Sequence, residues 1–406
     1  SSGTTNDKSK FLPVTPEILK GCHYKGGFDT VSIYLQNNPD SHFFASKGLI
    51  LGGSHSPSPL NRNAHCGDLS AVLLQNLNPL VNLIRVPDKK IILMDEWESK
   101  IKAIVESTWK TDVNSLSGVP SWMLVLIKAV LQKTGSEYLT DVWPNMEVFF
   151  HGGISFEPYR DQYKALIPSD RMHYMETYNA SEGFFGLQDN PEEHSLLLMI
   201  DYSVFYEFIP INEVGEEHPT VLPLEAVEVG KNYAMVITTS GGLWRYQIGD
   251  TVRFTSLYPH KFVISGRTKN FINAFGEELM VDNADKAISR VCRQTGAKVK
   301  EYTAAPLFML DKAKGRHQWM IEFEKMPPSL DDFASLLDKT LQQLNSDYEA
   351  KRYKEISLQP LEIRVAREGT FYEWLRRKGK LGGQHKIPRL SNDRTFIEEL
   401  GKICDL

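Results

Sequence analysis

The chain has 406 residues, of which 41% are hydrophobic and 24% are charged, a composition typical of a globular protein of about two or three domains. Asp and Glu (51) outnumber Lys and Arg (46), so the formal charge is −5 and the basic surplus of most nucleic-acid-binding proteins is missing. The longest apolar run, 123–131, is interrupted by Lys128 and is too short to cross a bilayer, so no membrane segment is predicted.

Residues 1 to 266 alternate apolar runs of strand length with segments of helical spacing. Runs rich in β-branched and aromatic residues predict strands at 43–51 and 147–151, one or two strands within 196–208, and a strand at 233–240 that is followed by a Gly241-Gly242 turn. Apolar residues spaced as on one face of a helix predict helices at 69–77 and 121–134. Together these elements predict a large α/β domain with several sheets.

The pattern changes after Gly266, and residues 267 to 406 are predicted to form a smaller α+β domain. Strands are predicted at 301–310, 317–324 and 361–366, and helices at 282–292, 371–378 and 392–403. Another helix is predicted after Pro327-Pro328-Ser329, where apolar side chains follow the helical period of about 3.6 residues: Phe333, Leu336, Leu337, Leu341 and Leu344.

The four cysteines form no C-x-x-C pair: Cys22, Cys66, Cys292 and Cys404. This spacing indicates neither a zinc ribbon nor a disulfide framework and favours a reducing, cytoplasmic compartment. A zinc site in the His- and Cys-containing segment 54–68 is a weak alternative, because its spacing matches no known finger. The opening residues Ser1 to Thr5 have the composition of a loop that follows a strand, so we expect further residues before them.

The first group of residues with a chemical implication is this same opening segment. Hydroxyl side chains surround Gly3, and Lys8 and Lys10 follow. Glycine lets backbone N–H groups approach an anion, hydroxyls donate hydrogen bonds and lysines add positive charge, so the segment is a candidate phosphate cradle. It is not a Walker A loop. The alternative is a polar terminus that binds nothing.

A second group combines an aromatic ring, hydroxyls and one carboxylate: Glu176-Thr177-Tyr178-Asn179-Ala180-Ser181-Glu182-Gly183. The ring of Tyr178 offers a flat face to a purine, the hydroxyls of Thr177 and Ser181 suit phosphate oxygens, and Glu182 suits a hard cation such as Mg2+. Upstream, Gly152-Gly153 ends a predicted strand and leaves room for a base against the backbone. The alternative is a polar turn after a strand.

A third group lies near the predicted domain boundary. Asp250 follows a glycine, and its carboxylate oxygens can accept hydrogen bonds from both hydroxyls of a ribose. Arg267 follows 17 residues later and can reach a ribose or a phosphate. The alternative is that Asp250 is an ordinary surface aspartate at a hairpin and that Arg267 is an ordinary solvated arginine.

The chain resembles the Gretchen Hagen 3 family of acyl acid amido synthetases, within the adenylate-forming superfamily, through five segments: SSGTTNDKSKFLPVT, TYNASEGFFG, YQIGD, SGRTKNFINAFGEEL and LNSDYEAKR. The resemblance runs from Ser1 to about Arg394. It implies the adenylate-forming fold, with a large N-terminal α/β domain of multiple sheets (1–266) and a small, mobile C-terminal α+β domain (267–406). Asn6-Asp7 stands where a CoA ligase usually has glycine and proline, which favours the amido synthetase branch.

Site residues follow from the resemblance, position by position. It implies that ATP phosphates are held by Ser1, Ser2, Thr4 and Thr5. It implies that adenine and the α-phosphate are lined by Gly153, Thr177, Tyr178, Asn179, Ala180 and Ser181. Glu182 would ligate Mg2+, Asp250 would bind the ribose, and Arg267 would support ribose or phosphate. Lys269 would lie at the hinge, and Lys386 would meet the reacting carboxylate.

These roles imply an ATP-dependent enzyme with two small-molecule substrates, a carboxylic acid and an amino acid. The acid would attack ATP to give acyl-AMP, and the amine would then displace AMP to give an amide. An apolar acyl pocket is expected near Phe184, Phe185 and Trp122, although all three rings could instead be core. A CoA ligase with the same first step and a catalytically inactive nucleotide-binding module remain alternatives.

Overall fold

The computed structural model describes residues 11–53, 55–57, 65–157, 159–268, 271–272, 274–275, 277, 279–308, 315–352, 358–379 and 387–405. Within them, twelve strands form one sheet in the order β11-β10-β12-β13-β14-β9-β8-β7-β6-β5-β1-β4. The bounds are β1 (Lys47–Ile50), β4 (Arg85–Val86), β5 (Val113–Gly118), β6 (Val148–Gly152), β7 (His173–Ala180), β8 (Gly183–Leu187), β9 (Leu196–Leu198), β10 (Val204–Pro210), β11 (Leu222–Pro223), β12 (Asn232–Thr239), β13 (Tyr246–Leu257) and β14 (His260–Arg267).

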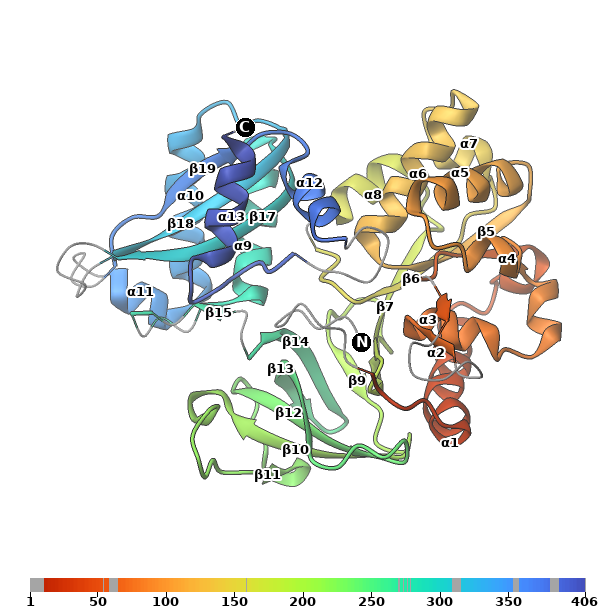
Figure 1. Cartoon of the computed structure of the whole chain (residues 1–406), viewed down its shortest axis with the longest axis horizontal. Coiled ribbons are helices and arrows are strands. Elements are labelled where there is room, and N and C mark those ends of the chain that lie inside the picture. Colours follow the sequence, from red (N-terminus) through yellow and green to blue (C-terminus); the bar gives the residue numbers. More distant parts are fainter. Residues whose placement is uncertain are drawn as a thin grey trace.

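This sheet has a parallel half and an antiparallel half that meet at β7. Strands β4, β1, β5, β6 and β7 pair in parallel, whereas the pairings from β7 to β11 are antiparallel. In Figure 1 the antiparallel strands β10 to β14 form a separate lobe below the helices that cover the parallel half. The change of direction at β7 places the residues after it between the two halves.

Helices cover the parallel half on both faces, as parallel sheets require. Their bounds are α1 (Pro16–Ile18), α2 (Lys25–Asn37), α3 (Leu69–Gln75), α4 (Lys89–Ile92), α5 (Trp97–Thr108), α6 (Pro120–Thr134), α7 (Leu139–Val142) and α8 (Arg160–Leu166), with a π-helical turn, Leu19–Tyr24, between α1 and α2. Helix α6 begins with a proline and ends at Gly135, whose φ of 72° closes it in the left-handed region. Its buried Met123, Ile127 and Val130 pack with β1, β5 and β6 in one core.

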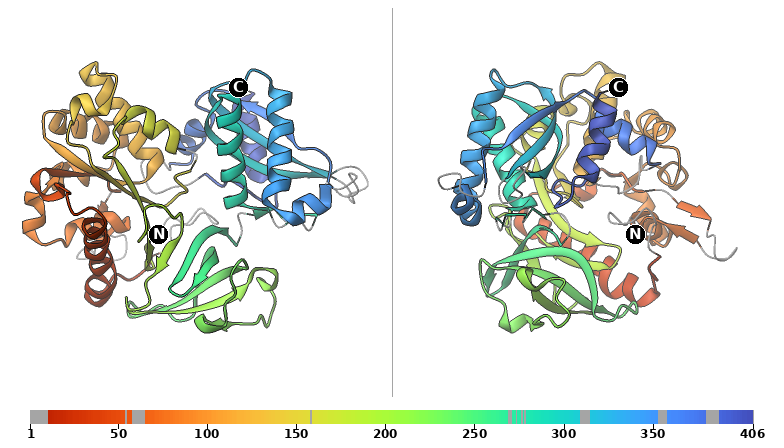
Figure 2. Two further views of the ribbon diagram at one scale, coloured as in Figure 1. Left: turned by 180° about the vertical axis from the view of Figure 1, so that it is seen from behind. Right: turned by 60° about the vertical axis from the view of Figure 1, so that its left-hand side comes forward.

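The C-terminal region is built on a second sheet. Strands β17 (Lys298–Phe308), β18 (Gly315–Lys325) and β19 (Glu362–Ala366) form it, with helices α9 (Val281–Thr295), α10 (Leu330–Leu344), α11 (Ser346–Arg352), α12 (Thr370–Arg377) and α13 (Thr395–Cys404). Side chains of β18 alternate between two cores: Trp319 and Ile321 pack with α9 and α10, and Met320 packs with α12 and α13. Figure 2 shows this three-layer unit beside the larger sheet. Two short hairpins complete the described strands: β2 (His55–Pro57) with β3 (His65–Gly67), and β15 (Phe271–Ile272) with β16 (Leu279–Met280).

The structure confirms the expected combination of a large mixed α/β region and a smaller α+β region. One predicted strand, 43–51, begins too early, because 43–45 is a 3-10 turn and β1 starts at Lys47. The motif around Tyr178 is mostly strand rather than turn, since β7 continues to Ala180. In the part of the chain that the structure describes, no helix combines the length and apolarity needed to span a bilayer.

Candidate nucleotide site

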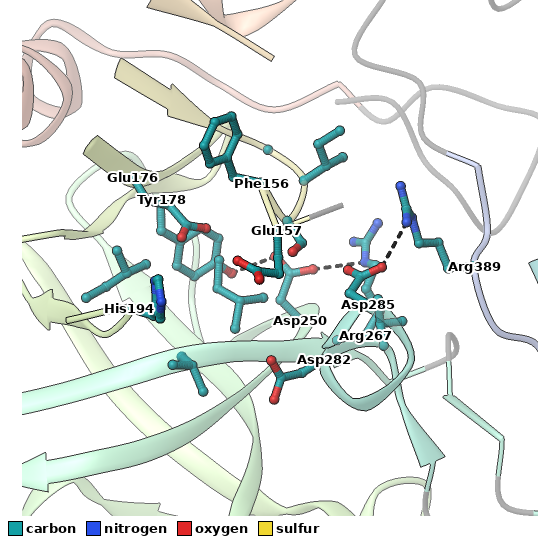
Figure 3. Close-up of a pocket in the computed structure, with 18 of the residues that line it drawn as sticks. Phe156, Glu157, Glu176, Tyr178, His194, Asp250, Arg267, Asp282, Asp285 and Arg389 are labelled. Carbon is teal, nitrogen blue, oxygen red and sulfur yellow. Dashed lines mark hydrogen bonds and ion pairs between the residues drawn. The ribbon is translucent and has the colours of Figure 1, made fainter. Parts of the chain in front are cut away.

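A cavity of about 450 Å³ lies between the end of β7, the hairpin of β13 and β14, and helix α9 (Figure 3). The larger sheet contributes Tyr178, Glu182, Asp250 and Arg267 to its lining, and the loop after β6 contributes Gly153 to Glu157. The C-terminal region contributes Asp282, Asp285, Lys286, Arg290, Arg293 and Arg389. The cavity is therefore walled by both regions of the molecule.

Asp250 is held on both carboxylate oxygens in this cavity. The register of β13 and β14 places it opposite Arg267, whose Nε lies 2.9 Å from Asp250 Oδ1. The Tyr178 hydroxyl donates to Asp250 Oδ2 at 2.6 Å. Each carboxylate oxygen has two lone pairs, so both oxygens can still accept a hydroxyl from a ligand. The aspartate is thus oriented before any ligand arrives.

Two glycines let β6 and its loop come close to β7. A Cβ on Gly152 would lie 2.3 Å from the backbone oxygen of Thr177, so only glycine permits this pairing. Gly153 has a φ of 86°, in the left-handed region that favours glycine, and it lines the cavity. This close approach is between two strands, so the expectation that Gly152-Gly153 leaves room for a base stays a prediction.

The turn after β7 brings three more predicted residues to the cavity: Asn179, Ser181 and Glu182. The Asn179 side chain is fixed from behind by His23 of the π-helical turn, with Nδ1 and Oδ1 2.9 Å apart. Burial lowers the pKa of His23 to about 4, so its ring is neutral at neutral pH. Glu182 is 8% exposed, and burial raises the pKa of its carboxyl above its ordinary value.

Glu182 suits an Mg2+ ion bound together with phosphate groups. Mg2+ commonly takes one or two carboxylates and completes its shell with water and substrate phosphates. The Glu182 carboxylate accepts a hydrogen bond from its own backbone N–H, and no described side chain forms a hydrogen bond or ion pair with it, so lone pairs remain for a ligand. No cluster of three His, Cys, Asp or Glu side chains that could hold a metal occurs among the described residues.

The opposite wall is held by ion pairs rather than by strand register. Glu157 accepts from Arg160 at 3.1 Å and from Arg293 of α9 at 3.3 Å. The Arg389 guanidinium lies 2.8 Å from Asp285 and 3.1 Å from the Tyr159 hydroxyl. Figure 3 shows the Asp285–Arg389 pair on one side of the cavity and the Tyr178–Asp250–Arg267 group near its middle.

Seven of the predicted nucleotide-binding residues line this one cavity: Gly153, Tyr178, Asn179, Ala180, Ser181, Asp250 and Arg267, together with the predicted metal ligand Glu182. The ring of Tyr178 is only 6% exposed and contacts Phe185 and Phe262. Thr177 is directed elsewhere, since its hydroxyl donates to the carbonyl oxygen of His151. Ser1, Ser2, Thr4, Thr5, Lys269 and Lys386 lie outside the described residues.

The three aromatic residues expected at an acyl pocket are not brought to this cavity. Phe184 is buried over Gly26 and packs against Tyr202. Phe185 is fully buried in the core of the larger sheet. Trp122 packs edge-on against Trp97, with ring centroids 4.7 Å apart. On β8 the side chains on both faces are buried, so residues next to Glu182 in sequence face the core.

Sequence reasoning missed several residues of the site. Glu157, Arg160 and Glu176 line it, as do the charged residues of α9. Glu176 could have been found from the two-residue period of a strand, because it shares a face of β7 with Tyr178. His23 carried no local signal, because it lies 156 positions from the Asn179 that it holds.

Comparison with known proteins gives a consistent family. The GH3 family N-terminal domain model matches residues 1–172, the central domain model matches 197–267, and the C-terminal domain model matches 282–395. The chain is 30% identical to the indole-3-acetic acid-amido synthetase GH3.4 of Arabidopsis thaliana, covering 93% of this chain and 66% of that protein. It is 27% identical to the 4-substituted benzoates-glutamate ligase GH3.12 of the same plant, over 76% of this chain and 59% of that protein.

Solved structures show the same fold. The GH3.15 acyl acid amido synthetase superposes over 100% of this chain and 80% of that chain, with a TM-score of 0.76 and 18% identity. A 2-hydroxyisobutyryl-CoA ligase in the postadenylation state gives a TM-score of 0.54 at 12% identity, over 93% of this chain and 72% of that chain. The chain spans 66% of the length of GH3.4 and 46% of that of the Arabidopsis thaliana amido synthetase GH3.3. Because three models of one family cover most of the sequence and the fold agrees, the chain belongs to the GH3 family.

Proposed function

We propose that the protein activates a carboxylic acid with ATP and then transfers the acyl group to an amino acid. The observation that carries this proposal is that a hydroxyl, carboxylates and a guanidinium converge in one cavity: Ser181, Glu182, Asp250 and Arg267. Relatives of the same family are named amido synthetases and ligases. The Glu182 carboxylate, as a candidate Mg2+ ligand beside the Asp250–Arg267 pair, suits a nucleoside triphosphate better than a neutral metabolite.

In the first step, a carboxylate oxygen of the acid attacks the α-phosphorus of ATP, and pyrophosphate leaves with the electrons of the broken P–O bond. This step needs positioning and neutralisation of charge more than covalent help from the protein. Asp250, fixed by Tyr178 and Arg267, would hold the ribose, and Ser181 would donate to the α-phosphate. Glu182 would hold Mg2+, which when bound neutralises phosphate charge.

In the second step, the amine of the amino acid attacks the acyl carbon, AMP leaves and one proton is released. We propose that the C-terminal region, residues 267–406, reorients between the two steps about Lys269. The larger sheet ends at Arg267, and the cavity is lined from both sides of that point, which supports this proposal. Lys386 remains the candidate for contact with the reacting carboxylate.

The expected compartment remains the cytoplasm. Among the described cysteines, Cys22, Cys292 and Cys404 are free thiols.

Pyrophosphate exchange tests the first step directly. The purified protein is incubated with ATP, Mg2+, labelled pyrophosphate and a panel of aryl and alkyl carboxylic acids, and label in ATP is counted. At least one acid should support exchange. Glu182→Ala should lower that rate by at least about 100-fold, because losing a metal contact costs several kcal/mol at the transition state. Glu192→Ala is the matched control, since Glu192 is exposed and does not line the cavity.

Two outcomes would contradict the proposal. Unchanged exchange in Glu182→Ala would remove this residue from the metal site, and absence of exchange across the whole panel would favour an inactive nucleotide-binding module. The acceptor is then identified from AMP release: amino acids should stimulate it, whereas stimulation by CoA alone would indicate a CoA ligase.

A further inference from the structure

The two regions of the molecule also meet at a second place, away from the cavity. The ring of Trp122 on α6 packs against the apolar cluster of α12 and α13. The Tyr372 hydroxyl of α12 lies 3.4 Å from Glu98 Oε1 of α5. Lys128 Nζ of α6 lies 3.3 Å from Glu324 Oε2 of β18. We call these five residues the side junction, and they contribute nothing to the described lining of the cavity.

The side junction combines an aromatic centre with exposed charges. Trp122 is supported from its own region by Trp97, whose ring centroid lies 4.7 Å away. The side chains of Lys128 and Glu324 are 48% and 34% exposed, so their ion pair contributes little by itself. One packed ring with a few exposed polar pairs resembles the interfaces between domains that separate during function. The side junction can therefore form and break as the C-terminal region moves.

Ile387 connects the side junction to the cavity. It packs against the same apolar cluster as Trp122, and it also lines the cavity. In the sequence, Ile387 directly follows Lys386, the candidate for contact with the reacting carboxylate. Arg389 lines the cavity as well. The arrangement that closes the side junction is therefore the one that brings Ile387 and Arg389 to the cavity.

The C-terminal region is expected to move as one body, because both of its cores share strand β18. Ile321 packs with α9 and α10 on one face of the strand, and Met320 packs with α12 and α13 on the other. Figure 1 shows α12 on the side of this region that faces α6 and α8. A rotation about Lys269 would open the side junction and withdraw Ile387 from the cavity in the same movement.

We propose that the side junction positions the segment before Ile387 for the first step, acyl-AMP formation, and opens for the second step. This inference rests on the proposed function, because it takes Lys386 to contact the carboxylate of the acid. The members of the side junction are positioning residues, since none of them lines the cavity. Weakening the side junction should slow acyl-AMP formation and leave the transfer to the amine as fast as before.

Two other roles for the side junction predict different results. A contact that only stabilises the fold would affect both steps alike when it is broken. A contact that serves the second step would slow amide formation and spare acyl-AMP formation. Measuring the two steps separately distinguishes all three roles.

The test uses the purified protein and the acid that gives the fastest pyrophosphate exchange. Exchange reports the first step, and amide formation from chemically prepared acyl-AMP and an amino acid reports the second step without ATP. Lys128→Glu places a carboxylate opposite Glu324 and should lower the exchange rate about fivefold without slowing amide formation from acyl-AMP. Adding Tyr372→Glu sets a second carboxylate opposite Glu98, so this double variant should lower exchange at least about tenfold.

A charge swap separates positioning from a general loss of stability. Combining Lys128→Glu with Glu324→Lys restores opposite charges across the side junction, so the exchange rate should return to within about twofold of the wild type. Lys133→Glu is the matched control, because Lys133 lies on the same helix and pairs at 2.6 Å with Glu106 of α5, inside the larger region. It should change neither step by more than about twofold.

Small-angle X-ray scattering gives a readout that does not depend on activity. The Lys128→Glu/Tyr372→Glu protein should have a larger radius of gyration than the wild type, because its C-terminal region is less often docked. Circular dichroism confirms that each variant is folded.

Several results would overturn this inference and leave the proposed function in place. They are equal slowing of both steps, slowing of amide formation alone, failure of the charge swap to restore exchange, and unchanged exchange or scattering in the folded double variant. Absence of exchange in the wild type with every acid would overturn the proposed function and this inference with it.

Discussion

The two walls of the cavity are built differently. On the sheet side, Asp250 is fixed by the pairing of β13 with β14 and by the Tyr178 hydroxyl, all within one continuous sheet. On the α9 side, Glu157 is connected to Arg293 across two regions of the chain, and the arginine is 49% exposed. The sheet wall is held by strand register, whereas the α9 wall is held to it by partly exposed ion pairs. This difference suits a sheet wall that binds the nucleotide in a fixed position and an α9 wall that can separate from it.

Substitutions in the sheet wall should therefore weaken nucleotide binding strongly, whereas substitutions in the contacts across the cavity should have small effects. Groups locked by backbone pairing keep their geometry without a ligand, which lowers the entropic cost of binding. Exposed ion pairs contribute at most about 1 kcal/mol each, so they permit the regions to separate. The following substitutions test both halves of this comparison.

The largest effect is expected for Asp250→Ala. The substitution removes the ribose acceptor and leaves Arg267 and the Tyr178 hydroxyl without their shared partner. Pyrophosphate exchange should fall by at least about 100-fold, close to 3 kcal/mol, mostly through KM for ATP. Steady-state kinetics of exchange measure this, with circular dichroism to confirm folding. Asp40→Ala, at an exposed aspartate, is the control. A change in kcat alone would show that Asp250 does not bind the ground-state nucleotide.

An intermediate effect is expected at His23, which supports the sheet wall from behind. The pKa of His23 is lowered from 6.5 to about 4 in the folded protein. Between these pH values the His23 ring is protonated in the unfolded chain but stays neutral in the folded protein. Stability should thus fall as pH drops from 6.5 toward 4. Between about pH 7 and pH 5 the wild type should lose about 2 kcal/mol more unfolding free energy than His23→Gln, whose amide does not titrate.

Urea titrations at both pH values measure this difference. Glutamine can still donate to Asn179 Oδ1, so the variant isolates the titration from the hydrogen bond. Equal pH dependence in the two proteins would mean that His23 is not held neutral by the fold.

The smallest effect is expected for Arg293→Gln. Glu157 keeps its contacts with Arg160 and with the Ser289 hydroxyl, so removing Arg293 leaves no uncompensated charge. Unfolding free energy should change by no more than about 0.5 kcal/mol, and KM for ATP by less than about threefold. Chemical denaturation and exchange kinetics at low and high salt check both values. A loss as large as that of Asp250→Ala would mean that the α9 wall is as firmly held as the sheet.

Much of the fold follows from local patterns in the sequence. The period of α6 and α10 and the β-branched run of β12 gave elements within a few residues of the observed bounds. The sequence motifs also predicted residues that lie together in the structure, since Glu182, Asp250 and Arg267 line one cavity. Each of these signals is short-range, or depends on a fixed set of residue types.

What sequence reasoning missed depends on contacts between distant segments. The hydrogen bond from the Tyr178 hydroxyl to Asp250, 72 positions later, has no local signal, and the contact of its ring with a base stays a prediction. Phe184 and Phe185 follow the metal candidate directly, yet β8 is buried on both faces and removes their rings from the cavity. The α9 wall has no motif, because its lysine and arginines look like any solvated helix face.

Arg389 has a consequence for how the two regions could part. Its guanidinium is neutralised within its own region, by Asp285 at 2.8 Å and Glu301 at 3.1 Å, and it reaches across only through the Tyr159 hydroxyl. If the C-terminal region swung away, the arginine would travel with both of its counterions. At Arg389, departure would then expose no unpaired charge and would give up one hydrogen bond to a neutral group, worth about 1 kcal/mol. The Arg389–Tyr159 contact would therefore break at little cost in free energy. It could form again without Arg389 having to find new counterions.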